Sequence, residues 1–240
     1  ERVLPGNIIF EIKNNNRVIG GLTKHASKVA KDFYASFSQG NLSLTNSKTA
    51  EMVKLTENSY RDVNIAFANE LSIISEKLNI DVFELIKVAN LHPRVNILNP
   101  GCGVGGHCIS VDPWFIVDAA PKESNLIKKA REVNNNKTDW IYNKTNIEID
   151  KFKNKFSKPP IIGCLGLTFK PNVEDIRESP ALKIVMKLIE NNHELLICEP
   201  NLKSQHPFKI SDLETVISIA DIILILVAHK QFYNLDFKGK

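Results

Sequence analysis

The sequence predicts an α/β fold with a mostly helical middle region and a parallel, doubly wound sheet near its C-terminal end. Strand and helix patterns alternate from residue 161 to residue 228. The stretch "IADIILILVA" at 219–228 is apolar throughout, as is typical of a buried strand in a parallel sheet. Two stretches earlier in the chain predict long helices: 49–78 has apolar residues at helical spacing, and 124–150 contains no proline or glycine.

The first half of the chain predicts short strands followed by helices. We expect strands at 17–22 and 42–45, with Thr23 capping a helix between them. A long helix is expected over 49–78, where six apolar residues share one face: Met52, Leu55, Val63, Phe67, Leu71 and Ile74. A shorter capped helix follows at 81–90.

The second half begins with a long helix over 124–150, which suits a spine between two domains. The segment 153–160, "KNKFSKPP", reads as a basic linker that ends in proline. Beyond it the pattern predicts a strand at 161–169, a helix at 179–192 with Ser179 as its cap, a strand at 193–200, a helix at 212–220 and a strand at 221–228.

Composition and charge narrow the classes of partner. The net charge of +4 is scattered along the chain, which indicates no nucleic-acid partner. No apolar run reaches the ~18 residues of a membrane span, and no secretory signal is visible. We therefore expect a cytoplasmic protein with reduced cysteines. Cys164 and Cys198 lie in strand-like runs and should be buried, whereas Cys102 and Cys108 lie among glycines, where a buried role is not indicated.

The glycine loop 99–115, "NPGCGVGGHCISVDPWF", admits several interpretations. Its glycines match G-x-G-x-x-G, but a dinucleotide fingerprint needs a strand before it and a helix directly after it. Here Pro100 precedes the first glycine and Pro113 stops the segment that follows. A zinc site at Cys102, His107 and Cys108 is disfavoured because adjacent ligands close a tetrahedron poorly and no second Cys/His pair is near.

Two interpretations of the loop stay open. It is either a glycine-rich turn without chemistry or the setting of a reactive thiol. The second is favoured by the grouping of Cys108 beside His107, among backbone N–H groups and four residues before Asp112. Such surroundings favour the thiolate, and the carboxylate is suited to orient or activate water.

Five segments together resemble the UDP-glucose/GDP-mannose dehydrogenase family, over nearly the whole chain. They are "ERVLPG", "AEMVKLTENSYRDVNIAFANE", "HPRVNILNPGCGVGGHCISVDPWF", "AREVNNNK" and "GLTFKPNVEDIRESPA". The form "GGHCISVDPWF" followed by "AREVN" is most similar to members that oxidise UDP-N-acetyl-D-mannosamine. Members acting on UDP-N-acetylglucosamine are the next most similar, and those acting on UDP-glucose are more distant.

The resemblance implies an NAD-dependent, four-electron oxidation of the sugar C6 alcohol to a carboxylate. It implies that Cys108 is the nucleophile, forming a thiohemiacetal and then a thioester. Lys54 would stabilise the oxyanion, with Asn58 helping to fix a water or the substrate oxygen. Asp112 would serve proton transfer and Glu1 would serve thioester hydrolysis.

The resemblance also implies the binding residues. Arg2, Val3, Leu4 and Lys170 would contact the UDP-sugar, and Arg177 would face the phosphates of NAD. Arg94 would reach the substrate of the neighbouring subunit, which implies a homodimer; no metal is implied. Without the resemblance, Lys54 and Arg61 would be interpreted as solvated helix charges, and Arg177 with Glu178 as an exposed ion pair.

Three regions are expected from this comparison. Residues 1–118 would hold the tail of the N-terminal nucleotide-binding domain and a helical region with the catalytic loop. Residues 119–155 would form a connecting spine helix at a dimer interface, and 156–240 a truncated Rossmann-like domain for UDP.

The sequence departs from the family pattern in two ways, and each leads to a further expectation. The family's strand–GxGxxG–helix unit would lie before residue 1, so this chain alone is expected to be inactive. The alternative is a non-catalytic remnant that dimerises or binds UDP-sugar. In addition, Cys102 replaces the usual proline of "GPGVGG", which leaves a disulfide with Cys108 open.

Overall fold

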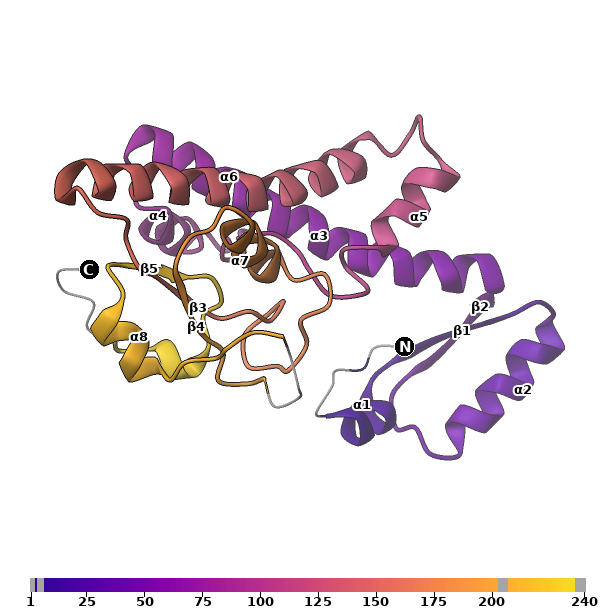
Figure 1. The fold of residues 1–240 in the computed structure, drawn as a ribbon. Helices are drawn as coiled ribbons and strands as arrows, with labels where there is room; N and C mark the ends of the chain where they lie inside the picture. The colour runs from indigo at the N-terminus through magenta and orange to yellow at the C-terminus, as the bar shows by residue number, and fades with distance from the viewer. Residues whose placement is uncertain (1–2, 4–6, 203–206, 236–240) are drawn as a thin grey trace. The chain divides into compact units, whose positions relative to one another are not determined.

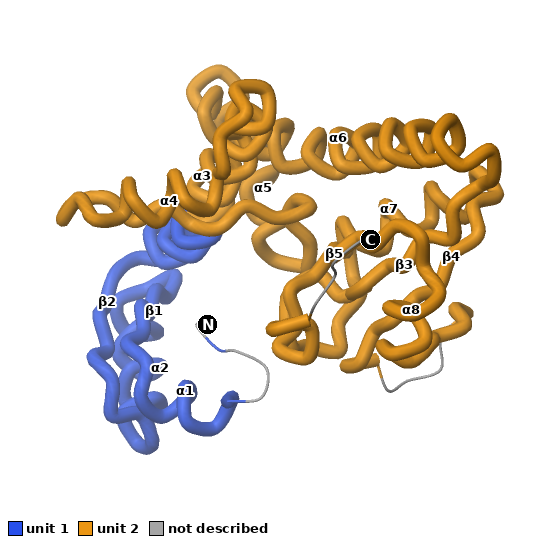
Figure 2. The backbone as a smooth tube through the Cα atoms, turned by 90° about the vertical axis from the view of Figure 1, so that its left-hand side faces the viewer, with its two compact units in different colours: residues 1–60 blue, residues 61–240 orange. Residues whose placement is uncertain are grey.

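A computed structural model of the protein describes residues 3, 7–202 and 207–235. The chain divides into two compact units, residues 1–60 and 61–240 (Figure 2). Across these described ranges, no helix combines the length and the apolar character needed to cross a membrane.

Unit 1 is built on a parallel pair of strands. Its elements are α1 (Ile8–Asn14), β1 (Arg17–Gly21), α2 (Lys24–Ala35), β2 (Leu42–Asn46) and the first part of α3 (Ser47–Leu78). Arg17 of β1 pairs with Leu42 of β2, and Thr23 caps α2 by accepting the Ala26 N–H at 3.1 Å. The two predicted strands and the Thr23 cap are therefore confirmed. Helix α1 was not predicted, and its start carries no side-chain cap.

Unit 2 begins with long helices, as predicted. The rest of α3 is followed by α4 (Val82–Ala89), α5 (Asp112–Ala119) and α6 (Asn125–Phe156). The prediction that 153–160 is a linker is wrong for its first four residues, because α6 continues to Phe156. No residue there breaks the helix until Ser157, which ends it at φ +53°, ahead of two prolines.

A three-stranded parallel sheet completes unit 2. Its elements are β3 (Ile162–Leu165), α7 (Pro180–Glu190), β4 (Leu195–Cys198), α8 (Leu213–Ile219), β5 (Ile222–Ile225) and a 3₁₀ turn, η1 (Lys230–Phe232). The strand order is β4-β3-β5, and Ile162 of the central strand pairs with Leu195 and Ile222. The predicted alternation of strands and helices is confirmed.

Helices cover both faces of this sheet (Figure 1). On one face, α7 and the end of α6 pack against the strands in a core that includes Ile149, Ile184 and Leu188. On the other face, α8 and η1 form a smaller core with Val216 and Phe232. Each fully buried Leu or Ile contributes about 1.5–3 kcal/mol, so the two cores hold the layers together. This is the predicted doubly wound architecture.

A buried ion pair joins α3 to α6. The Arg131 Nη1 atom lies 2.5 Å from Asp62 Oδ1, and the two side chains are 2% and 0% exposed. Asn134 donates to the same carboxylate oxygen at 2.8 Å. Burial raises the pKa of Asp62, an effect that Arg131 and Asn134 oppose only in part. The pair thus fixes how the two helices meet, at a desolvation cost that its partners must offset.

Replacing Arg131 tests this dependence. Arg131→Met leaves the Asp62 carboxylate buried without its cation, and we expect the free energy of unfolding to fall by about 3–5 kcal/mol. Urea unfolding followed by circular dichroism measures the change. The double variant Asp62→Leu/Arg131→Met should recover part of the loss because no charge stays buried.

A matched control is Lys129→Met on the same helix. Lys129 pairs with Glu132 at 3.1 Å, but the two side chains are 72% and 40% exposed. Removing this pair should cost less than about 1 kcal/mol. An Arg131→Met effect no larger than that of Lys129→Met would contradict the role of the buried pair.

Candidate functional site

The glycine loop lies in unit 2 and leads into helix α5. Residues 95–105 form no strand or helix, and α5 begins at Asp112. The loop therefore has neither the preceding strand nor the immediately following helix of a dinucleotide fingerprint. The expectation that Pro113 stops the segment is wrong, since Pro113 lies in the first turn of α5. A proline is tolerated there because the first helical N–H groups have no partner within the helix.

Side chains of α3 and α6 anchor the start of the loop. Asn69 of α3 accepts the Gly101 N–H at 2.8 Å and donates to Asn134 of α6 at 2.8 Å. Thr138 of α6 donates to the Cys102 carbonyl at 2.9 Å. The loop is thus held by the two helices that the buried ion pair joins.

The crowding of glycines has a packing explanation. A Cβ atom on Gly103, whose φ is +135°, would lie 2.8 Å from Thr138 Oγ1 and 2.9 Å from the Asn134 carbonyl. A Cβ atom on Gly105 would lie 2.5 Å from the Glu178 carbonyl. Glycine is required at both positions because the loop backbone approaches α6 and the 178 segment closely.

Cys102 is a structural thiol, contrary to expectation. Its Sγ donates to the Leu226 carbonyl at 3.2 Å, and the side chain packs against the sheet core. Burial raises the pKa of this thiol to about 12, although the charge of Lys137 opposes the rise. All four cysteines are free. The predicted burial of Cys164 and Cys198 is confirmed.

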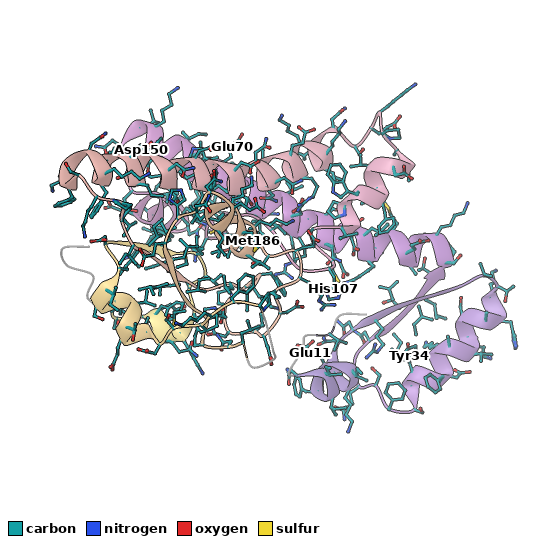
Figure 3. All side chains as sticks on the ribbon, viewed as in Figure 1. Glu11, Tyr34, Glu70, His107, Asp150 and Met186 are labelled. Carbon is teal, nitrogen blue, oxygen red and sulfur yellow. The ribbon has the colours of Figure 1, made fainter. Side chains whose placement is uncertain are left out.

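Cys108 lies in a different setting from Cys102. It is half-buried, and its carbonyl accepts the N–H groups of Val111 at 3.0 Å and Asp112 at 2.8 Å. This turn places the half-buried Asp112 at the start of α5, one turn after the thiol. The adjoining His107 is exposed and projects from the loop (Figure 3). Among the described residues, no three His, Cys, Asp or Glu side chains form a metal site.

Arg177 lies beside the Cys108 loop. Its carbonyl accepts the Gly106 N–H at 3.0 Å. Its guanidinium donates twice to Asp175, at 3.0 and 2.7 Å. These hydrogen bonds hold the pKa of Asp175 below its ordinary value, and nearby His107 adds to the effect. They also raise the pKa of Arg177, to which Cys108 adds weakly.

The expected ion pair between Arg177 and Glu178 is absent. Glu178 instead contacts Lys183 at 2.6 Å. The reason is geometric. Glu178 adopts a left-handed backbone, φ +51°, directly before Ser179, which caps α7. Asp175, in contrast, faces the guanidinium group of Arg177.

The Lys170 loop contacts the glycine loop through its neighbour Phe169. A Cβ atom on Gly106 would lie 3.0–3.3 Å from the Phe169 ring. Lys170 itself is half-buried, with its Nζ atom 5.3 Å from the centre of that ring. Unit 2 therefore brings three segments together: the turn with Cys108 and Asp112, the Lys170 loop, and the segment with Arg177.

The other predicted residues lie elsewhere. Lys54 and Asn58 belong to unit 1, four residues apart on α3; Asn58 is buried, and Lys54 lines a hollow of about 270 Å³ together with Arg17 and Tyr34. Figure 3 labels Tyr34 on α2. Arg94 is exposed in the turn after α4, and Val3 is half-buried. Glu1, Arg2 and Leu4 lie outside the described residues.

Several residues of this region were not predicted. Asn69 and Asn134 support the loop, Phe169 joins two loops and Asp175 binds Arg177. A local signal existed only for Asp175, a carboxylate two residues before an arginine. The side-chain amides of Asn69 and Asn134 gave no local signal, because the two residues are 65 positions apart in the sequence.

Family models match most of the chain. The model described as "UDP-glucose/GDP-mannose dehydrogenase family, central domain" matches residues 48–136. The model described as "UDP-glucose/GDP-mannose dehydrogenase family, UDP binding domain" matches residues 163–239.

Curated relatives and solved structures agree with these matches. A UDP-N-acetyl-D-mannosamine dehydrogenase of Campylobacter jejuni is 54% identical over 98% of this chain and 59% of its own length. An NDP-N-acetyl-D-galactosaminuronic acid dehydrogenase of Ralstonia solanacearum is 48% identical over 98% of this chain and 56% of its own length. A derivative structure of the UDP-N-acetyl-mannosamine dehydrogenase from Staphylococcus aureus has a TM-score of 0.85 and 43% identity, covering 98% of this chain and 55% of that one. The chain thus spans a little over half the length of these relatives.

The different settings of the four thiols predict selective alkylation. Iodoacetamide at pH 8 should modify Cys108 in the native protein and leave the other three intact. Burial raises the pKa of Cys164 to about 12 and, together with nearby carboxylates, that of Cys198 to about 11, as it does for Cys102. Peptide mass spectrometry measures the modification at each site. Native Cys108→Ser protein should stay unmodified, and modification of Cys102 at the rate of Cys108 would contradict the assignment.

Proposed function

Because the chain belongs to the UDP-glucose/GDP-mannose dehydrogenase family, we propose that it carries the covalent chemistry of a nucleotide-sugar 6-dehydrogenase. The proposed reaction is the NAD-dependent, four-electron oxidation of UDP-N-acetyl-D-mannosamine to UDP-N-acetyl-D-mannosaminuronate. The observation that carries the proposal is the half-buried Cys108, one turn before Asp112 and beside Arg177. A thiol in that position can hold an aldehyde covalently.

The steps assigned to this chain are additions to carbonyl carbon. The Cys108 sulfur attacks the C6 aldehyde, forming a carbon–sulfur bond, and the carbonyl oxygen takes up a proton to give a thiohemiacetal. Once C6 has reached the oxidation level of a carboxylic acid, it is joined to Cys108 as a thioester, and water attacks that thioester. The carbon–sulfur bond then breaks, releasing the carboxylate and the Cys108 thiol. Asp112 moves the protons, Lys54 stabilises the oxyanion, Asn58 orients a water or the substrate oxygen, and Glu1 assists hydrolysis.

NAD supplies the acceptor for both hydrides when it is bound. The described residues do not fit its pyrophosphate well. The glycine loop lacks a fingerprint's strand and helix. Gly20, which lies within β1, is closed off, since a Cβ atom there would clash with the Asn46 carbonyl of the neighbouring strand. Arg177, whose side chain is 62% exposed, is the residue that we assign to the cofactor phosphates.

We assign UDP to residues 156–240, where the UDP-binding family model matches. Lys170 would bind the nucleotide sugar from this domain, and Arg2, Val3 and Leu4 would line it from the N-terminal segment. Arg94 would reach the site of a second subunit, so we propose a homodimer with α6 at its interface. The product would serve the synthesis of a bacterial surface polysaccharide in the cytoplasm.

The sugar itself has competing candidates. UDP-N-acetylglucosamine differs from the proposed substrate at one stereocentre, and none of the residues above can be assigned to that centre. The similarity to a dehydrogenase named for N-acetylgalactosaminuronic acid adds a third hexosamine. The alternative from another functional class is a non-catalytic protein that dimerises or binds UDP-sugar but does not oxidise the sugar.

NADH formation tests the activity. The chain, and a longer protein in which the family's dinucleotide-binding unit precedes it, are mixed with NAD⁺ and each of the three UDP-N-acetylhexosamines. We expect two NADH per sugar from the longer protein, with the highest kcat/KM for UDP-N-acetyl-D-mannosamine. Cys108→Ala should lower kcat by more than about 1,000-fold because the covalent step is lost.

Cys102→Ala serves as the control thiol variant and should keep most of the activity. A higher kcat/KM for another epimer would overturn the substrate assignment. If both proteins bind UDP-sugar but produce no NADH, the dehydrogenase assignment fails and the binding function remains.

Sedimentation tests the proposed dimer. Ile147 is a 55% exposed apolar residue of α6, and Ile147→Asp should weaken dimerisation at least about tenfold by placing a charge in the interface. Leu22→Asp is the matched control because Leu22 is 92% exposed and lies outside α6. A wild-type protein that sediments as a monomer at micromolar concentration would contradict the homodimer.

A further inference from the structure

A buried acid–imidazole pair lies at the carboxyl ends of the three strands. Glu199 directly follows β4, and His229 lies four residues after β5. Both side chains are fully buried, and His229 Nε2 lies 3.0 Å from Glu199 Oε2. The carboxyl ends of parallel strands meet at one edge of a sheet, where α/β proteins bind their ligands. Neither residue has a part in the chemistry assigned above.

Glu199 holds the first residues of the loop that carries Lys170. Its Oε2 atom accepts the N–H groups of Leu167 at 2.7 Å and Thr168 at 3.1 Å, while Oε1 accepts the Asn201 N–H at 2.9 Å. Burial by itself raises the pKa of Glu199, but the hydrogen bonds from His229, Leu167 and Asn201 outweigh it and lower the pKa to about 2. The group is therefore a carboxylate, which accepts these hydrogen bonds more strongly than a neutral acid would.

His229 holds the other end of the loop. The Asn172 N–H donates to Nδ1 at 2.9 Å, so Nδ1 carries no proton and the Nε2–H donates to Glu199. The Thr168 hydroxyl, 3.3 Å from Nε2, lies 3.0 Å from the Lys170 carbonyl, to which it donates. Asn172 Oδ1 in turn accepts the Lys230 N–H at 3.0 Å.

We propose that the Glu199–His229 pair is the positioning device of the Lys170 loop. It fixes residues 167–168 and 172 on either side of Lys170, so that this ammonium group is presented at the carboxyl edge of the sheet before the nucleotide sugar arrives. The proposal rests on the proposed function, because it takes Lys170 as a ligand of the UDP-sugar. His229 acts through the loop and does not itself touch substrate.

Removing the imidazole has a defined consequence for the backbone. The Asn172 N–H would lose the acceptor that fixes it, and the fully buried Glu199 carboxylate would lose a donor, which is costly for a buried charge. The loop would therefore sample more conformations, and the ordering cost would fall on substrate binding. A pre-ordered Lys170 avoids that cost.

Two readouts separate the loop from the substrate. The first is amide hydrogen exchange of the free protein, resolved at Leu167, Thr168 and Asn172, whose N–H groups bond to the pair. The second is the dissociation constant for UDP-N-acetyl-D-mannosamine, measured calorimetrically without NAD.

The variants are chosen to keep the fold. His229→Gln can keep a donor to Glu199 but loses the Nδ1 acceptor. Asn172→Gly removes only the side-chain contact to Lys230, because glycine adopts the φ of +60° found there. Asn192→Gly, at φ +58° after α7, is its matched control.

For His229→Gln we expect exchange at the three loop amides to accelerate at least about tenfold while the β3 amides keep their protection. We expect the dissociation constant to rise at least about tenfold. Asn172→Gly should shift both readouts in the same direction by a smaller factor, and Asn192→Gly should shift neither. Lys170→Ala should weaken binding without accelerating exchange. Because His229 acts through Lys170, the double variant His229→Gln/Lys170→Ala should bind within about threefold of Lys170→Ala.

The outcomes are distinguishable. Unchanged exchange at residues 167, 168 and 172 in His229→Gln would overturn the proposed positioning, whatever the protein binds. Accelerated exchange with wild-type affinity would overturn its role in binding, as would effects of His229→Gln and Lys170→Ala that simply add. Failure of the wild-type protein to bind any UDP-N-acetylhexosamine would instead overturn the proposed function.

Discussion

The buried polar contacts between α3 and α6 are the constraint on which the rest of unit 2 depends. A carboxylate and a guanidinium removed from water are costly unless they face each other, so the contact between Arg131 Nη1 and Asp62 Oδ1 holds one helix against the other, while Asp62 Oδ2 and Arg131 Nε stay without a hydrogen-bond partner among the described residues. Asn134 and Asn69 extend this arrangement to the backbone of Gly101. Apolar packing alone would tolerate small slips between the helices, whereas these hydrogen bonds do not. These contacts therefore also determine the position of the glycine loop.

Local signals in the sequence predicted most of the fold. Helices α3, α4 and α7 combine an apolar face or stripe with an uninterrupted stretch, and Thr23 and Ser179 mark starts that the structure confirms. Pro113 shows where such signals become ambiguous. A proline disfavours the helix interior but is favoured in the first turn, and the sequence alone does not say which position it occupies. The end of α6 was misjudged for a related reason, since lysines and asparagines neither stop a helix nor demand one.

The candidate site was predictable only in its local part. The turn from Cys108 to Asp112 spans five residues, so its chemistry could be read directly from the sequence. The environment of Cys102 could not, because its thiol bonds to a carbonyl 124 residues away. The same holds for Arg177, whose choice between Asp175 and Glu178 depends on a left-handed backbone at Glu178. Long-range contacts decide burial, and burial decides which groups can react.

The two cysteines of the loop show how the fold separates structure from chemistry. They are six residues apart, with Gly103, Gly105 and Gly106 between them, and they differ mainly in what lies against them. The Cys102 side chain packs against the sheet core, and desolvation there raises the pKa of its thiol to about 12, so that it serves as a small apolar residue with one donor. Cys108 follows the exposed His107, and its own carbonyl accepts N–H groups of Val111 and Asp112 at the start of α5. The glycines between them let the backbone pass from one environment to the other within a few residues. In this loop, Gly103 and Gly105 are required because a side chain at either position would clash with α6 or with the segment at residue 178.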